Sequence, residues 1–124
     1  MQKRSFRSVK ITYFDMAGVR RAAQDFAARL AAEHPEVLRV VLFGSVATGE
    51  AAPGSDADFL VIISHSDKEF LERMAQYRPD HFPVGADVFP YTEEELEQML
   101  REGNFFLRRA LTEGITLFPA EAAS

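Results

Sequence analysis

Cysteine and tryptophan are both absent from this sequence of 124 residues. The lack of cysteine excludes disulfide bonds, thiolate zinc sites and cysteine nucleophiles. No apolar run approaches the roughly 20 residues that a helix needs to cross a bilayer. The basic residues near the amino terminus are not followed by the apolar core of a signal peptide. We therefore expect a cytoplasmic protein that does not enter a membrane.

Two common nucleotide motifs and a strongly basic charge are also missing. The sequence contains no GxxxxGKS, GxxxxGKT or GxGxxG, which excludes a P-loop and a Rossmann dinucleotide site. The net charge is −5, whereas proteins that hold nucleic acid through its phosphates usually present a concentrated basic face. Nucleic acid is therefore not the expected partner.

The residues that are present have the composition of an ordinary globular domain, with 47% hydrophobic and 27% charged residues. No internal repeat or low-complexity linker divides the chain. We expect a single domain over residues 1–124, large enough to bury about two thirds of its unfolded surface. Within it, residues 1–14 are expected to form an arm or an edge strand.

Apolar residues at spacings of three and four predict four helices. They are expected from the cap Asp15 to His34, after a capping box at 66–69, after a second capping box at 92–95, and from Asn104 to Gly114. The inward-facing residues are expected to be Phe70, Leu71 and Met74 in the second helix, and Leu96, Met99 and Leu100 in the third.

Short runs of apolar and β-branched residues predict strands between these helices. The strands are expected at Val37–Phe43, 59–63, 84–89 and 115–118. Pro90 is expected to close the third of them. This order of elements predicts an α/β (α+β) domain with a mixed β-sheet flanked by helices.

Three acidic residues and a Gly-Ser pair stand at the ends of the expected strands. Gly44-Ser45 follows the first strand, Asp56 and Asp58 enter the second, and Asp87 lies in the third. Residues two apart on a strand point to the same face, so Asp56 and Asp58 present two carboxylates side by side. Asp87, on a neighbouring strand about 4.8 Å away, can complete a cluster of three carboxylates.

Such a cluster needs a compensating charge, because carboxylates that lie together repel each other. Mg²⁺ prefers carboxylate oxygen and completes its shell with water and substrate phosphates. Two such ions about 3.5–4 Å apart can activate an attacking oxygen and stabilise a leaving one. Gly44 lets a phosphate approach the backbone, Ser45 adds a hydroxyl donor, and the amides of a short helix starting near Val46 favour an anion.

Each of these residues also has a simpler interpretation. Asp56 after a Pro-Gly turn can be a turn residue, and Gly44-Ser45 can be a plain break between strand and loop. Asp80 is the other acid near Asp87, but it lies in a proline-flanked loop. Aspartate is unfavourable within an apolar strand, which favours Asp58 and Asp87 as functional residues.

Gly44-Ser45, ten intervening residues and Asp56-Ala57-Asp58 resemble the GS-x10-DxD signature of the polymerase-β-like nucleotidyltransferase superfamily. From about Phe26 onward the order of elements is most similar to the minimal nucleotidyltransferases. The resemblance implies two Mg²⁺ ions held by Asp56 and Asp58, and terminal phosphates of a nucleoside triphosphate cradled by Gly44 and Ser45. It also implies that Asp87 helps to bind one metal ion and to deprotonate the acceptor hydroxyl. The α-phosphorus is then attacked and pyrophosphate is lost.

Members with this minimal architecture are often paired with a HEPN-domain protein in toxin–antitoxin modules, and some transfer AMP to a tyrosine of the toxin. The resemblance therefore implies an antitoxin that transfers AMP from ATP to a hydroxyl of a HEPN partner. It leaves open whether the protein forms homo- or hetero-oligomers. The family often reads GS-x-A-R-G, whereas this chain has Thr48 and lacks that arginine.

Two alternatives remain open. An antitoxin can block its partner by contact without turnover, and the missing arginine motivates that interpretation. A nucleotidyltransferase can also modify a small molecule such as an aminoglycoside, although such enzymes usually carry a further domain for the acceptor. Near the carboxyl terminus, Phe105 and Phe106 are expected in the core or at a partner surface. Arg108 and Arg109 can reach a phosphate, but a solvated helix face is the favoured interpretation.

Overall fold

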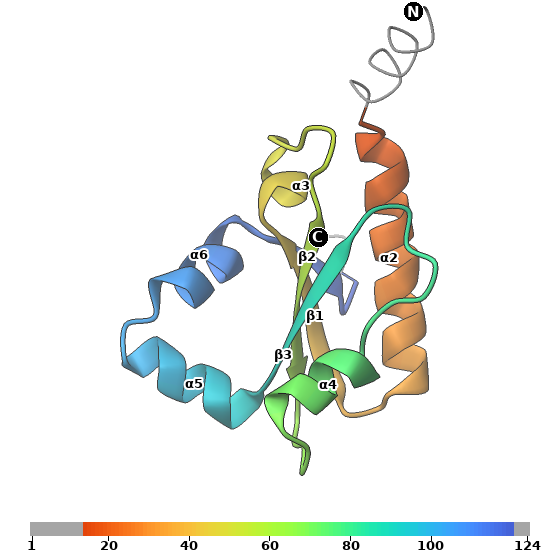
Figure 1. Ribbon diagram of the computed structural model, residues 1–124. Coiled ribbons are helices and arrows are strands. Elements are labelled where there is room, and N and C mark those ends of the chain that lie inside the picture. Colours follow the sequence, from red (N-terminus) through yellow and green to blue (C-terminus); the bar gives the residue numbers. More distant parts are fainter. Residues whose placement is uncertain (1–13, 121–124) are drawn as a thin grey trace, which may run out of the picture.

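The computed structural model describes residues 14–120, which form one four-stranded sheet with helices on both faces (Figure 1). The predicted arm at residues 1–14 therefore lies almost wholly outside the described residues. In chain order the elements are α2 (Met16–Glu33), β1 (Val37–Phe43), α3 (Ser45–Thr48), β2 (Ala57–Ile63), α4 (Phe70–Gln76), β3 (Ala86–Thr92), α5 (Glu93–Arg101), α6 (Phe105–Glu113) and β4 (Ile115–Phe118). Within residues 14–120, no helix is long and apolar enough to span a bilayer.

The sheet is mixed, with strand order β3-β2-β1-β4. Strand β1 runs antiparallel to both β2 and β4, whereas β2 and β3 are parallel. The predicted mixed sheet flanked by helices is thus confirmed. Because of these directions, the end of β1 lies beside the beginnings of β2 and β3. Gly44, Asp58 and Asp87 therefore come to one end of the sheet.

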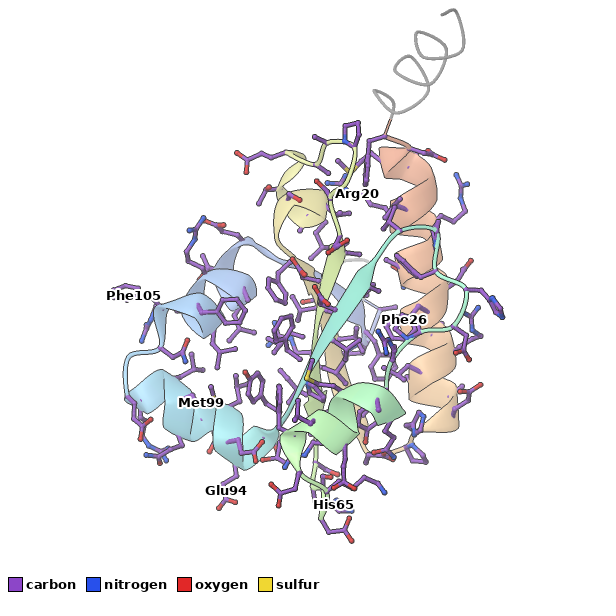
Figure 2. The ribbon with its side chains drawn as sticks, in the orientation of Figure 1. Arg20, Phe26, His65, Glu94, Met99 and Phe105 are labelled. Atoms are coloured by element: carbon purple, nitrogen blue, oxygen red, sulfur yellow. The ribbon has the colours of Figure 1, made fainter. Side chains whose placement is uncertain are left out.

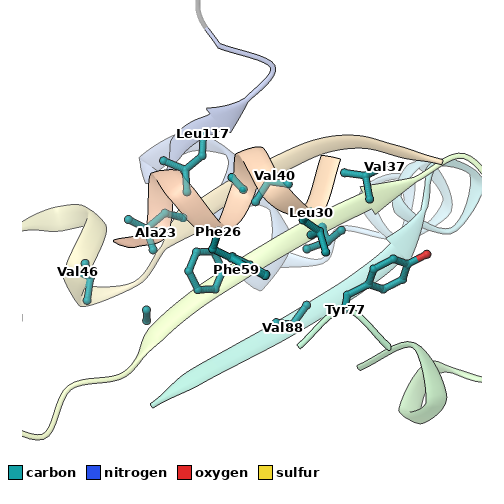
Figure 3. Packing of buried hydrophobic residues seen from close by; sticks show 14 of the residues in the cluster. Ala23, Phe26, Leu30, Val37, Val40, Val46, Phe59, Tyr77, Val88 and Leu117 are labelled. Atoms are coloured by element: carbon teal, nitrogen blue, oxygen red, sulfur yellow. The ribbon is translucent and has the colours of Figure 1, made fainter. Parts of the chain in front are cut away.

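Two apolar cores cover the two faces of the sheet. On one face, α2 packs Phe26 and Leu30 against Phe59 of β2 (Figure 3), and the rings of Phe26 and Phe59 meet edge to face at 4.9 Å. On the other face, Leu107 of α6 packs with Leu60 of β2. Because alternate residues of a strand face opposite ways, Asp58 points to the same face as Leu60, towards α6.

Three of the predicted helix caps act where they were expected. Asp15 accepts from the backbone N–H of Gly18 at 2.9 Å and caps α2, which ends before His34. Thr92 and Glu95 form a reciprocal capping box at the start of α5, and Asn104 caps α6. The expected inward stripe of α5 is also present, with Leu96 buried.

Three local predictions were wrong. The capping box of α4 is formed by Glu69 and Glu72, not by residues 66–69. Its expected apolar stripe is incomplete, because Leu71 is 77% exposed, and the buried residue of α4 is Arg73. Likewise β3 does not close at Pro90 but continues to Thr92. Proline is tolerated there because β3 is an edge strand, on which a missing N–H breaks no ladder on the outer side.

Arg73 is buried because its charge is fully used. Its guanidinium donates to both carboxylate oxygens of Glu95, at 2.7 and 3.0 Å, and to the backbone carbonyls of Lys68 and Pro90. Glu95 at the same time accepts from the N–H of Thr92. One carboxylate thus fixes α4 against the β3–α5 junction.

Removing that carboxylate should destabilise the fold in a pH-dependent way. The hydrogen bond from Arg73 is the main cause that holds the pKa of Glu95 below its ordinary value of 4.5. A depressed folded-state pKa gives stability that is present above the unfolded-state pKa and is lost as the pH falls through the folded-state value. We expect Glu95→Gln to cost about 2 kcal/mol at pH 7, after allowance for partial exposure.

Urea denaturation between pH 3 and pH 8 measures this effect. The gap between wild type and Glu95→Gln should be widest at neutral pH and narrow below about pH 4.5. Glu94→Gln, an exposed residue of the same helix turn, is the matched control and should unfold like the wild type at every pH. A gap that is constant with pH would contradict the prediction.

Candidate active site

Gly44 joins β1 to α3 in a conformation that only glycine adopts easily. Its φ is +81°, and a Cβ at this position would lie 2.5 Å from Oδ2 of Asp58. The carbonyl of Gly44 accepts the backbone N–H groups of Ala47 and Thr48 at 3.0 and 3.1 Å, which starts the single turn of α3. The Asp58 carboxylate therefore packs directly on the backbone that precedes Ser45.

Arg20 of α2 fixes this turn from outside. Its Nε and Nη2 donate to the carbonyl of Val46 at 3.0 and 2.8 Å, and Nη2 also donates to the carbonyl of Ala47 at 3.0 Å (Figure 2). Sequence analysis missed this residue, because its partners are 26 and 27 positions away. In the sequence Arg20 is indistinguishable from its exposed neighbour Arg21.

Arg20→Met should loosen α3 while leaving the helix core intact. Three charge-assisted hydrogen bonds to backbone carbonyls would be lost, and we expect about 1–2 kcal/mol of destabilisation. Thermal unfolding measures this effect, with Arg21→Met as the control. Equal stability of the two variants would show that α3 holds its place without Arg20.

Three carboxylates gather at the same end of the sheet. Asp58 of β2 lies directly opposite Asp87 of β3 in the parallel register, so both side chains point to the face that carries α6. Asp56 precedes β2 by one residue, and its carboxylate packs against the backbone of Gly85. Burial first, and then the negative charges of Asp87 and Asp56, raise the pKa of Asp58 to about 6. Asp56 and Asp87 are thus close enough to Asp58 for their negative charges to raise its pKa.

Asp56, Asp58 and Asp87 do not make a complete metal site by themselves. Within residues 14–120, no group of three or more Asp, Glu or His side chains is arranged to hold a metal ion. The three side chains offer hard carboxylate oxygens, and burial and the negative charges of Asp87 and Asp56 raise the pKa of Asp58. Both properties fit a divalent cation such as Mg²⁺, which is usually held by one or two carboxylates and completed by water and phosphate oxygens.

A hollow of about 460 Å³ lies between this end of the sheet and α6. That volume is in the range of small-molecule sites. Its lining includes Phe43, Gly44, Asp58, Phe106, Arg109 and Glu113. Asp56 and Asp87 are exposed and do not line the hollow; Asp87 instead borders a separate depression beside α4. Gly44 and Asp58 are therefore placed in the hollow, and the other two acids at its margin.

The outer wall of the hollow is aromatic. Phe106 packs edge to face on Phe43 at 5.4 Å and against Phe89 at 5.6 Å, yet it stays 48% exposed. Phe105, the next residue of α6, is 79% exposed and points away from the sheet (Figure 2). Phe105 and Phe106 were expected either in the core or at a partner surface. Phe106 is partly packed in the core, whereas Phe105 is not in the core.

A family model described as a nucleotidyltransferase domain matches residues 23–111, which span most of the chain and both sides of the hollow. The chain belongs to this family. The predicted family and the predicted enzyme class, a nucleotidyltransferase, are thereby confirmed. A comparison of the sequence with curated proteins finds no match.

Solved structures with the same fold agree with this assignment. A candidate nucleotidyltransferase from Sulfolobus solfataricus is 17% identical, with a TM-score of 0.57 over 82% of this chain and 80% of that one. A toxin–antitoxin complex with AMP-PNP is 19% identical, with a TM-score of 0.54 over 77% and 72%. A mutant of the toxin–antitoxin pair MntA–HpeT is 16% identical, with a TM-score of 0.51 over 77% and 71%. At these identities the likeness establishes the fold.

Proposed function

We propose that this nucleotidyltransferase transfers AMP from ATP to a hydroxyl group of a partner protein. The observation that carries the proposal is the pairing of Asp58 with Asp87 across β2 and β3, beside the Gly44–Ser45 turn. The proposal treats residues 1–124 as one minimal nucleotidyltransferase domain that acts in the cytoplasm. Its partner is the toxin of a toxin–antitoxin pair, a HEPN-domain protein.

Each residue of the cluster has a role in this proposal. Asp56 and Asp58 hold two Mg²⁺ ions, with Asp87 as a further ligand of one of them; the ions supply charge neutralisation for the phosphates. Gly44 and Ser45 bind the terminal phosphates through backbone amides and the serine hydroxyl. These groups orient the α-phosphorus and hold the charged phosphates at the carboxyl end of β1.

The reaction is an in-line displacement. The acceptor oxygen forms a bond to the α-phosphorus, the bond from that phosphorus to the α,β-bridging oxygen breaks, and pyrophosphate leaves with the electron pair. Asp87 takes the proton of the acceptor hydroxyl, directly or through water. Because Asp87 lies on the side of β2 away from Gly44, we expect the acceptor to approach from the side of β3 and α4.

Two structural neighbours support a toxin as the partner. Both are toxin–antitoxin complexes, and one of them contains AMP-PNP. In the other, two aspartates two positions apart are replaced by glutamate, which is the spacing of Asp56 and Asp58 here. The exposed Phe105 and Phe106 beside the hollow offer an apolar surface for a protein partner.

The proposal is tested with ATP labelled at the α-phosphorus. The chain is incubated with this ATP and Mg²⁺, with and without the product of the neighbouring gene, and the proteins are separated by electrophoresis. We expect label on the partner, no label after addition of EDTA, and no label with Asp56→Asn. Label that appears equally with Asp56→Asn, or no label on the partner with an active wild-type chain, would overturn it.

A second candidate is an antitoxin that neutralises its partner by contact alone. Thr48 at the place of the family's usual arginine favours it, because the turn after Ser45 lacks a positive charge for the triphosphate. Neutralisation of the toxin by Asp56→Asn separates the two candidates. If contact is enough, that variant protects cells as well as the wild type, whereas loss of protection supports transfer.

A further inference from the structure

An arginine of α6 lines the same hollow as Gly44 and Asp58. Nη2 of Arg109 donates to Oε1 of Glu113 at 3.2 Å, one turn further along α6, and both residues line the hollow. The side chains are 74% and 46% exposed. An exposed ion pair with this spacing is weak, so the Arg109 guanidinium can exchange Glu113 for a stronger acceptor.

The lining of the hollow has few positive charges to bind a triphosphate. Asp58 and Glu113 line it, and Arg109 is the one basic residue among the described residues of its lining. The turn after Ser45 offers only the hydroxyl of Thr48. Arg20, the basic residue that bonds α3, is already occupied by the carbonyls of Val46 and Ala47. For a nucleoside triphosphate in the hollow, which carries several negative charges, the basic side chain within reach is therefore that of Arg109 on α6.

We propose that Arg109 binds the β- and γ-phosphates of the nucleotide and supplies the positive charge that is missing after Ser45. This inference rests on the proposed function. Helix α6 packs on β1, the strand that ends at Gly44, and Asp87 lies on the other side of β2. Arg109 is thus on the side of the phosphates that leave, opposite the side of the acceptor.

Arginine suits this position better than lysine. Its planar guanidinium can donate two parallel hydrogen bonds to phosphate oxygens, whereas an ammonium group acts as a point charge. Arg109 forms no covalent bond in the reaction. It stabilises the negative charge that grows on pyrophosphate as the bond to the α-phosphorus breaks. Glu113 competes with the phosphates for the same guanidinium.

Equilibrium binding tests the inference without turnover. The ligand is α,β-methylene-ATP, which cannot release pyrophosphate, with Mg²⁺ and titrated by calorimetry into the folded full chain. We expect Arg109→Gln to weaken binding about tenfold, Arg109→Lys to weaken it less, and all variants to bind AMP alike. Glu113→Gln should strengthen binding several-fold, because it frees Arg109 and removes a negative charge. Arg108→Gln, at an exposed neighbour of Arg109 that does not line the hollow, should bind like the wild type.

The opposite signs for Arg109→Gln and Glu113→Gln separate a phosphate ligand from a structural ion pair. If the pair served only to stabilise α6, both substitutions would change binding in the same direction. That result, or unchanged binding by Arg109→Gln, would overturn the inference and leave the proposed function intact. Failure of the wild-type chain to bind the analogue with Mg²⁺ would overturn both.

Discussion

Asp58→Asn should abolish transfer and, in the absence of metal ions, make the protein more stable. We expect at least about a 10³-fold loss of labelled product, because a proposed ligand of the metal ions is lost from the centre of the cluster. The stability gain follows from the crowding of the carboxylates. Burial and the charges of Asp87 and Asp56 raise the pKa of Asp58 to about 6 from an ordinary value of 3.8.

A raised folded-state pKa fixes the sign of the pH dependence. The contribution of Asp58 to stability is fully present below the unfolded-state pKa, near 3.8, and is lost as the pH rises through about 6. At pH 8 the ionised Asp58 therefore costs the metal-free fold about 1–2 kcal/mol, after allowance for solvent screening. Asparagine removes that cost, so the variant should melt higher than the wild type at pH 8 but not at pH 4.

Thermal unfolding with EDTA and with Mg²⁺ measures both the destabilisation by ionised Asp58 and the stabilisation by bound metal ions. Mg²⁺ should raise the melting temperature of the wild type at pH 8 and leave that of Asp58→Asn unchanged, since the ion binds only the folded cluster. Asp80→Asn, an exposed acid outside the cluster, is the control and should respond to Mg²⁺ like the wild type. An Asp58→Asn variant that is less stable at pH 8 in EDTA would contradict the prediction.

Gly44→Ala should cause the second large effect, by displacing the same carboxylate. The φ of Gly44 is +81°, and the added Cβ would meet Oδ2 of Asp58 at 2.5 Å, which is closer than a non-bonded carbon and oxygen approach each other. We expect about 2–3 kcal/mol of destabilisation from backbone strain and crowding together. We also expect at least a 10²-fold loss of transfer, because a shift of about 1 Å in a catalytic group can cost that much.

Gly49 provides a control for this substitution. Its φ is +88°, but a Cβ there would meet nothing within 4 Å. The ψ of Gly49 is 8°, in the left-handed region, whereas that of Gly44 is −159°, a conformation essentially confined to glycine, so Gly44→Ala also carries the larger backbone strain. Comparing the two variants by urea denaturation and by transfer of labelled AMP measures the combined effect of that strain and of the carboxylate contact. Equal activity in the two variants would show that the packing of Gly44 on Asp58 has no part in the reaction.

Elements with local causes could be predicted from the sequence. The strand Val37–Phe43, the cap Asp15 and the capping box at Thr92 and Glu95 depend on residues within a few positions of each other, and all three are confirmed. The burial of Arg73 could not be predicted, because it depends on Glu95, which lies on another helix. The continuation of β3 through Pro90 depends on its place at the edge of the sheet.

The candidate site divides in the same way. The closeness of Gly44 to Asp58 follows from two neighbouring strands, and their spacing in the sequence was enough to single them out. The pairing of Asp87 with Asp58 depends on the parallel register of β3, which the pattern of apolar residues does not specify. Arg20 carries no sequence signal, because its role depends on two carbonyls of α3 that are distant in the sequence. The sequence offers both Arg108 and Arg109 as phosphate contacts, and only the hollow beside α6 distinguishes them. The catalytic roles of the three acids stay predictions.

The site has two halves that are built by different strand pairs. The antiparallel β1–β2 pair brings Gly44 to Asp58, and the parallel β2–β3 pair brings Asp87 to Asp58. Gly44 and Asp58 lie at the ends of adjacent strands that follow one another in the chain, so we expect this half to pair earlier in folding than the half that contains Asp87. Asp87 arrives only after the chain has crossed through α4. Substitutions in α4 and in the loop that follows it are therefore expected to displace Asp87, on the side proposed for the acceptor, more than the Gly44–Asp58 contact proposed for the nucleotide.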